Sequence, residues 1–303
     1  MIAKLLDIDR RWIFLLMLLA VAIPILTQAT FPEVPTGLAK TTFDKIEALD
    51  AGDRVYMAFD FDPASEGELG PMATSFTRHV CELARQRKQA GEPPIRMYFA
   101  TLWPAGTPLI QKTIDEVIKA DFPELQEHED WVNLGFKAGE DGVIKVVATD
   151  LRQMYLSDTN GVPLSEIEMM KGVGSIRDFD LIINVSAGFP GTKEWVLYAV
   201  TPFAEDVEIV AGCTGVQAPL LYPYIPQQLP GLLGAIKGAA EYEALVLEAY
   251  GNRNEDGTLD EPGKYTQGSR RMGPQLVAHV LMVMLIVAGN VLYFMARRRG
   301  IAS

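Results

Sequence analysis

Residues 54–101 decide the fold class and read RVYMAFDFDPASEGELGPMATSFTRHVCELARQRKQAGEPPIRMYFAT. The run 54–59 is short and rich in β-forming residues, which predicts a strand, and 95–101 has the same character. Between them, apolar side chains recur at helical spacing while charged ones occupy the opposite face, so we expect an amphipathic helix. Its apolar residues are Met72, Phe76, Val80, Leu83 and Ala84. Two strands joined by a crossover helix predict parallel pairing.

Three further runs predict strands, at 131–135, 180–186 and 207–212. Helices are expected at 108–120, 140–155, 192–200 and 232–250. Five strands, each followed by a helix, imply a parallel sheet with helices on both faces. The sequence therefore predicts an α/β protein with a five-stranded Rossmann- or flavodoxin-like sheet.

Charge-free apolar segments lie on both sides of this region, at 12–29 and 276–295. At about 1.5 Å per residue, each just crosses a hydrocarbon core of about 30 Å, so we expect two transmembrane helices. The alternative for the first is a cleaved signal peptide, since Thr27-Gln28-Ala29 fits a small-x-small site.

The expected parts follow from these segments. They are a cytoplasmic amino end (1–11), a transmembrane helix (12–30), a soluble α/β domain (31–250), a polar tether (251–271), a second transmembrane helix (272–296) and a basic carboxyl end (297–303).

Basic residues near the membrane ends favour one orientation. Six lie toward the chain ends (Lys4, Arg10, Arg11, Arg297, Arg298 and Arg299) and five on the loop side (Lys40, Lys45, Lys264, Arg270 and Arg271). The margin is small, and a long loop crosses largely regardless of its charge. We expect a two-pass protein of the inner membrane, with cytoplasmic ends and an extracytoplasmic domain.

Composition excludes several classes of protein. Of 303 residues, 49% are hydrophobic and 22% charged, with only two cysteines, which excludes a disordered, collagen-like or disulfide-stapled chain. Residues 31–270 hold 20 of the 27 basic and 37 of the 39 acidic residues, a net charge of −17. A surface this acidic argues against nucleic-acid binding.

The most distinctive motif follows the first predicted strand, where Asp60 and Asp62 form an Asp-x-Asp pair. Ligands in open α/β sheets collect at the carboxyl ends of the strands, where Thr101 also ends the second strand. These residues resemble the opening motif of the haloacid-dehalogenase superfamily. The resemblance implies that Asp60 is a phosphoryl-accepting nucleophile, Asp62 a general acid/base and Thr101 a phosphate-binding hydroxyl.

This resemblance departs from its pattern at the fourth strand, which offers Asn184 and Ser186 where magnesium chemistry needs acidic residues. The alternative is that the two aspartates form a turn and cap the next helix. Ser186 lies in Asn184-Val-Ser-Ala-Gly188, a fragment of a nucleophile elbow without its first glycine, and no histidine follows it within the soluble region. A glycine-rich turn is the favoured interpretation. No Cys/His metal spacing and no GxGxxG occur, so we expect no metal and no cofactor.

An uncharged stretch, 213–230, contains four prolines and two tyrosines. Stiff aromatic loops lose little entropy on docking, so Tyr222, Pro223, Tyr224 and Pro226 are candidates for a protein contact, between copies or with a membrane partner. The alternative is a packed cover over the sheet edge.

The second apolar segment holds two polar residues, His279 and Asn290. Eleven residues separate them, which places them on nearly the same face of a helix. Because polar side chains in a membrane usually face protein, we interpret them as a helix contact rather than a proton or ligand site.

The runs FDFDPASEGEL, NVSAGFPGTKEW and GVQAPLLYPYIP, with the order of parts given above, resemble an uncharacterised group of bacterial membrane proteins with two anchors and an α/β domain. The resemblance implies this architecture only, and it does not indicate an activity. We expect an interaction or ligand-sensing subunit of a larger membrane assembly rather than an enzyme. The alternative is a membrane-tethered phosphohydrolase that uses Asp60 and Asp62.

Overall fold

The structure is a computed structural model that describes residues 9–27, 33–252, 254 and 263–298. Two compact units are present, one made of 1–32 and 269–303 and the other of 33–268.

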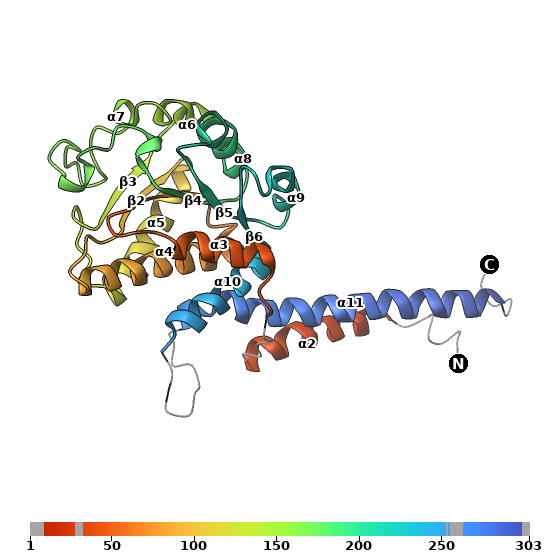
Figure 1. Cartoon of the computed structure of the whole chain (residues 1–303). Coiled ribbons are helices and arrows are strands. Elements are labelled where there is room, and N and C mark those ends of the chain that lie inside the picture. Colours follow the sequence, from red (N-terminus) through yellow and green to blue (C-terminus); the bar gives the residue numbers. More distant parts are fainter. Residues whose placement is uncertain (1–8, 28–32, 253, 255–262, 299–303) are drawn as a thin grey trace. The chain divides into compact units, whose positions relative to one another are not determined.

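The larger unit is built on a parallel sheet of six strands in the order β3-β2-β1-β4-β5-β6 (Figure 1). The strands are β1 (Arg54–Asp60), β2 (Arg96–Thr101), β3 (Trp131–Phe136), β4 (Leu181–Ser186), β5 (Ile209–Cys213) and β6 (Gly231–Gly234). All neighbouring strands pair in parallel. The α/β class and the parallel sheet are thereby confirmed.

The expected count of five strands is wrong, because β6 forms a sixth at the edge beside β5. Two of the four residues of β6 are glycines, a residue type that is depleted in strands. The other two, Leu232 and Leu233, fall at the start of the range 232–250, where the sequence predicts the last helix. Packing explains the glycine at 231. A Cβ atom there would lie 2.5 Å from Oγ1 of Thr42, in the helix that covers β6.

Helices cover both faces of the sheet (Figure 1). One face carries α3 (Gly37–Glu47), α4 (Glu66–Gln89), α5 (Thr107–Thr113) and α10 (Ala235–Tyr250). The other carries α6 (Asp141–Val147), α7 (Leu151–Met154) and α8 (Thr192–Trp195), with α9 (Ala218–Leu221) beside α8. The central strands are buried on both faces, as expected for a parallel sheet covered by helices.

Several helix boundaries differ from the expected ones. The range 140–155 holds α6 and α7 rather than one helix, because the Asp150 carboxylate accepts a hydrogen bond from the backbone N–H of Gln153 and starts α7 anew. The expected helices at 108–120 and 192–200 begin as α5 and α8 and continue as π-helical segments, Ile114–Lys119 and Val196–Val200. The last helix, α10, begins at Ala235 because 232–234 belong to β6.

The smaller unit contains α2 (Arg10–Thr27) and most of α11 (Gln267–Arg298). Both helices are long and apolar enough to cross a membrane. Large apolar side chains on them are exposed, including Trp12 and Leu26 on α2 and Ile286 and Phe294 on α11. Length and composition therefore make both helices candidate membrane spans.

Candidate functional site

Asp60 ends β1 at the place where the strand order reverses, between β1 and β4. Its side chain is fully buried. Oδ1 accepts a hydrogen bond from the backbone N–H of Leu102 at 2.7 Å. Oδ2 accepts from Nδ2 of Asn184 at 2.7 Å and from Nε1 of Trp195 at 2.9 Å. One carboxylate thus connects the ends of β1 and β2 with β4 and α8.

Burial raises the pKa of Asp60 to about 6, against the opposing effect of its three hydrogen bonds. A nucleophile has to reach its substrate, whereas this carboxylate is enclosed and both of its oxygens are occupied. The geometry therefore suits a group that holds strand ends together better than one that attacks a phosphate ester.

A hydroxyl network extends from Asn184 to Ser186. Oγ1 of Thr192 donates to Oδ1 of Asn184 at 2.6 Å, and Oγ of Ser186 lies 2.8 Å from Oγ1 of Thr192. Oγ of Ser186 also accepts from the backbone N–H of Thr192 at 3.0 Å. Asp60 and Ser186 are register partners on β1 and β4, so the fold brings these two predicted residues together, both buried. Ser186 orders the turn into α8.

Thr101 and Asp62 lie near this network without joining it through a hydrogen bond in the described part of the chain. Oγ1 of Thr101 accepts from the backbone N–H of Trp103 at 3.0 Å, and a Cβ atom at Gly106 would lie 2.3 Å from it. Oδ1 of Asp62 accepts from the backbone N–H of Ser65 at 3.0 Å. Thr101 is therefore enclosed, and Asp62 orders the turn before α4.

A hydrogen bond joins the loops on the two sides of the strand-order reversal. Trp103, in the loop after β2, donates from Nε1 to the carbonyl oxygen of Pro190, in the loop after β4, at 2.8 Å. A Cβ atom at Gly188 would lie 3.7 Å from the same indole ring. The indole thus spans the carboxyl end of β1, where open α/β sheets commonly bind their ligands.

The uncharged stretch after β5 contains both exposed and buried residues. Tyr222 is 55% exposed and Pro223 and Pro226 are exposed, whereas Tyr224 packs against the hydrophobic core. Leu221 and Leu229 are buried. The stretch therefore covers the sheet edge with one set of side chains and presents another set outward.

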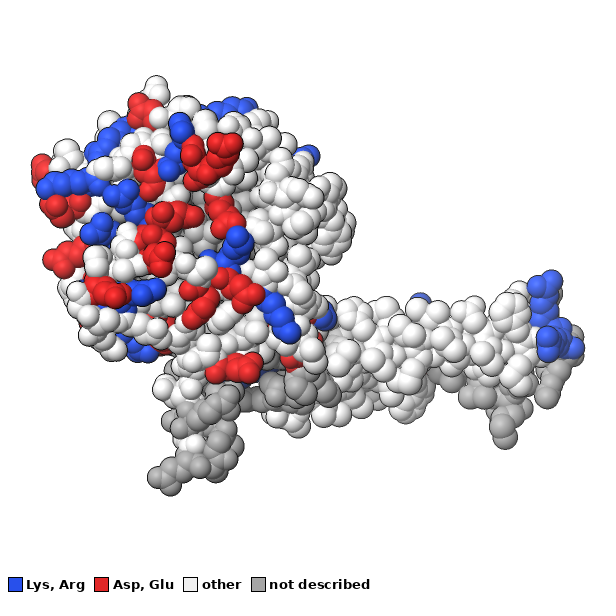
Figure 2. Space-filling model, viewed as in Figure 1, with Lys and Arg blue, Asp and Glu red and all other residues white. Residues whose placement is uncertain are grey.

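Four large apolar residues after β4 and β5 are exposed, and we call them the apolar edge patch: Phe189 in the loop after β4, Val216 before α9, Leu220 in α9 and Tyr222 just after α9. Each is more than half exposed. No charged residue occurs between Glu208 and Lys237. Figure 2 shows the consequence: the side of the α/β domain that carries α9 is white, while the charged residues of the domain in this view gather away from that side.

In α11, the side chains of His279 and Asn290 are both exposed. Nδ2 of Asn290 donates to the carbonyl oxygen of Ile286, one turn earlier, at 2.9 Å. Within the described residues they make no contact with each other, and their role as a helix contact stays a prediction.

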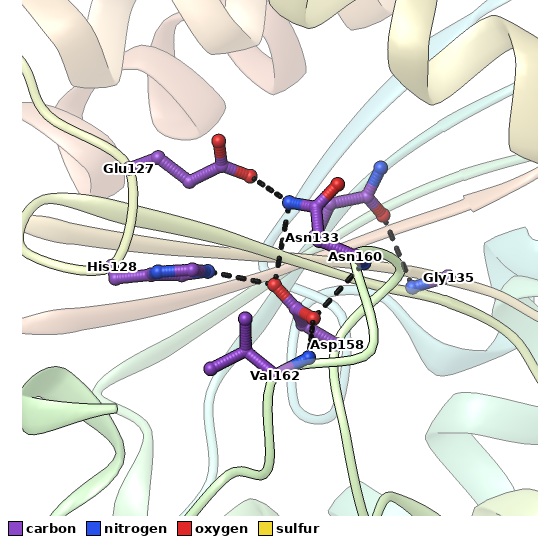
Figure 3. A network of polar contacts seen from close by, with 7 residues as sticks. All are labelled: Glu127, His128, Asn133, Gly135, Asp158, Asn160 and Val162. Atoms are coloured by element: carbon purple, nitrogen blue, oxygen red, sulfur yellow. Dashed lines mark hydrogen bonds and ion pairs between the residues drawn. The ribbon is translucent and has the colours of Figure 1, made fainter. Parts of the chain in front are cut away.

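A polar cluster that the sequence analysis missed lies beside β3 (Figure 3). Glu127 and His128 precede this strand, and Asp158 follows α7. One ligand atom from each of the three lies within 4.8 Å of the others. Nε2 of His128 is 2.7 Å from Oδ2 of Asp158, whose side chain is fully buried. These residues offer an imidazole nitrogen and carboxylate oxygens, which are ligand atoms that divalent metals bind.

Comparisons with known proteins add no relative: no family model, no curated protein and no solved structure matches the chain.

Proposed function

We propose that the chain is a membrane-anchored subunit of a larger membrane protein assembly, and that its α/β domain docks a partner protein through the apolar edge patch. The main observation behind this proposal is that three apolar side chains are exposed in the longest uncharged part of an acidic domain. They are Val216, Leu220 and Tyr222. Exposed apolar patches with polar surroundings mark interaction sites in soluble proteins.

Charge supports a protein partner rather than a lipid or nucleic-acid surface. The region 31–270 carries a net charge of −17, so anionic lipids and phosphates are repelled over most of its surface. The stretch that holds Val216, Leu220 and Tyr222 itself contains no charged residue. Partner contacts concentrate their energy in a few aromatic or arginine side chains, and Tyr222 is such an anchor.

We place the chain in the inner membrane as a two-pass protein with its domain outside the cytoplasm. The helices α2 and α11 have the length and composition of membrane spans. Basic residues are slightly more numerous near the chain ends than near the membrane on the loop side, which favours cytoplasmic ends.

We also propose that the domain is Rossmann-like. Its strand order, β3-β2-β1-β4-β5-β6, is the order of doubly wound dinucleotide-binding sheets. The likeness concerns topology, since no glycine-rich GxGxxG follows β1. Neither a ligand-sensing role nor the phosphohydrolase alternative gains support, because Asp60, Ser186 and Thr101 bond to the chain itself.

Mass determination of the full chain, purified from its own membrane in mild detergent, tests the assembly. We expect a particle larger than one chain plus its detergent. A bare monomer would contradict the proposal. Magnesium-dependent turnover of a generic phosphate ester, lost when Asp60→Asn and Asp62→Asn are combined, would instead support the phosphohydrolase.

A further inference from the structure

We propose that Glu127, His128 and Asp158 bind a divalent first-row transition metal ion, for which zinc is the best probe. Their ligand atoms already converge: all lie within 4.8 Å of one another, although they come from two separate turns (Figure 3). The site is independent of the interaction role proposed above, and it departs from the expectation of no metal.

The distances are close to those of a metal site. Tetrahedral zinc with bonds of about 2.1 Å holds its ligand atoms about 3.4 Å apart. Nε2 of His128 and Oδ2 of Asp158 are 2.7 Å apart, so an ion between them requires a separation greater by about 0.7 Å. The His128 side chain is 30% exposed, which leaves it room to move and leaves the site reachable from solvent.

Asp158 is oriented by its own loop. Its Oδ1 accepts hydrogen bonds from the backbone N–H groups of Asn160 at 2.9 Å and Val162 at 2.8 Å. These bonds turn Oδ2 toward His128. Hydrogen bonds that fix a ligating carboxylate in this way are a regular part of metal sites, because they hold the ligand in place before the ion arrives.

The charge of the cluster also favours a cation. Within the part of the chain that the structure describes, no ion pair joins Glu127 or Asp158 to a lysine or arginine, and the imidazole of His128 is the only basic group paired with Asp158. A buried carboxylate is costly unless it is paired or bound to a metal. A divalent ion would offset both carboxylates at once.

Asn160 offers a fourth ligand. Its Nδ2 lies 2.8 Å from Oε1 of Glu127 and 3.5 Å from Oδ2 of Asp158, so its side-chain amide points into the cluster. Turning the amide over places Oδ1 where Nδ2 now lies, a change that alters the shape of the side chain little. One imidazole nitrogen with three oxygens suits zinc or manganese. Calcium, which takes six to eight oxygen ligands, fits this set less well.

The ion would fasten a loop to the edge of the sheet. β3 is an edge strand, and the loop that holds Asp158 already pairs with it through the backbone N–H of Thr159, which donates to the carbonyl oxygen of Asn133 at 2.9 Å. Covering an edge strand protects it from pairing with other chains. A metal clasp between 127–128 and 158 would stabilise this cover.

Titration of the full chain tests the site, using tag-free protein in mild detergent that has been stripped with a chelator. Zinc is the probe, followed by calorimetry, with calcium as the comparison. We expect one zinc ion per chain, calcium bound at least tenfold more weakly, and at least tenfold weaker zinc binding in Glu127→Gln and in His128→Asn. Asparagine is chosen at 128 because the backbone there is left-handed, with φ at 68°, which asparagine tolerates.

Glu129→Gln is the matched control, because it makes the same charge change on the exposed neighbour of the site. It should bind zinc as the unmodified chain does. Equal loss in the control, equal affinity for calcium, or affinity within threefold of the unmodified chain in both site variants would overturn the proposal. If His128→Asn fails to fold, Glu127→Gln decides alone, since Glu127 is half-buried and, within the described residues, its side chain is hydrogen-bonded only to Asn160.

Discussion

Nδ2 of Asn184 lies 2.7 Å from Oδ2 of Asp60, and this bond joins the two strands between which the order of the sheet reverses. Asp60 also accepts from Leu102 and Trp195. The carboxylate of Asp60 therefore accepts hydrogen bonds from three buried donors in three parts of the chain. Its removal would leave all three donors without this acceptor.

Replacing Asp60 by alanine is expected to lower the free energy of unfolding by at least about 3 kcal/mol, because each orphaned buried donor costs about 1–3 kcal/mol. Asp62→Ala is the control, since the Asp62 carboxylate accepts one local hydrogen bond and its removal should cost only about 0.5–1.5 kcal/mol. Urea unfolding of the full chain in detergent measures both. Equal losses in the two variants would contradict the structural role of Asp60.

The pKa of Asp60 predicts a specific pH dependence. Burial raises this pKa from 3.8 to about 6, so between these values the unfolded chain loses a proton that the folded chain keeps. The contribution of Asp60 to stability therefore falls as the pH rises from 3.8 to 6, by about 3 kcal/mol in total. Asp60→Asn cannot titrate. The unfolding free energy of the unmodified chain minus that of Asp60→Asn should decrease as the pH rises from 3.8 to 6. A difference that does not change with pH would contradict the raised pKa.

His79 should act in the opposite sense. Its ring is fully buried, with Nδ1 2.6 Å from the hydroxyl of Tyr242 and Nε2 2.8 Å from Oε2 of Glu47. Burial lowers the pKa of His79 below 6.5, although Glu47 opposes this. The unfolded chain therefore binds a proton first on acidification, and stability is lost as the pH falls from 6.5 through the folded pKa.

His79→Gln keeps a polar side chain and removes this titration, so its unfolding free energy should depend less on pH between 6.5 and 5. The hydrogen bond from His79 also lowers the pKa of Glu47, whose contribution is lost only below about 4.5. Because the two windows differ, urea unfolding at closely spaced pH values separates them. An unchanged slope near pH 6 in the variant would show that His79 does not titrate there.

Much of the fold could be predicted from the sequence because strands β1 to β5 are short, mostly apolar runs between turn signals. β6 could not, since Gly231 lets Thr42 approach the strand, which is a matter of packing rather than of local propensity. The single helix expected at 140–155 failed for a local reason: Asp150 begins a new helix by capping it.

The position of Asp60 in the fold could be predicted from the sequence, but its burial and its hydrogen-bond partners could not. Strand assignments placed Asp60 at the carboxyl edge, but its burial depends on Asn184 and Trp195, which lie 124 and 135 residues further along the chain. Glu127, His128 and Asp158 gave no signal, because loops have no periodicity and a spacing of 30 residues matches no metal motif. Only the folded chain brings them together.

The proposed orientation predicts the labelling of one introduced thiol. Cys81 and Cys213 are both buried, so the unmodified chain should not react with a membrane-impermeant maleimide. Leu156 is 76% exposed on the α/β domain, and Leu156→Cys should be labelled in intact spheroplasts. Labelling only after lysis would place the domain in the cytoplasm and reverse the orientation.

Tyr222 and Tyr224 are two residues apart, yet the structure gives them different environments. Tyr222 is 55% exposed, whereas Tyr224 packs against the hydrophobic core. Truncating an aromatic anchor at a protein contact costs about 2 kcal/mol or more, which weakens binding by more than tenfold. Tyr222→Ala should therefore weaken the assembly with little change in the fold, while Tyr224→Ala should lower the unfolding free energy.

Blue-native electrophoresis and circular dichroism of the same preparations distinguish these outcomes. Leu156→Ser is the control, since it removes an exposed apolar side chain that lies outside the uncharged stretch, and it should leave the assembly intact. If Tyr222→Ala assembles as the unmodified chain does, the edge patch is not the docking surface. If Tyr222→Ala loses its fold instead, Tyr222 is part of the packed cover over the sheet edge rather than a docking residue.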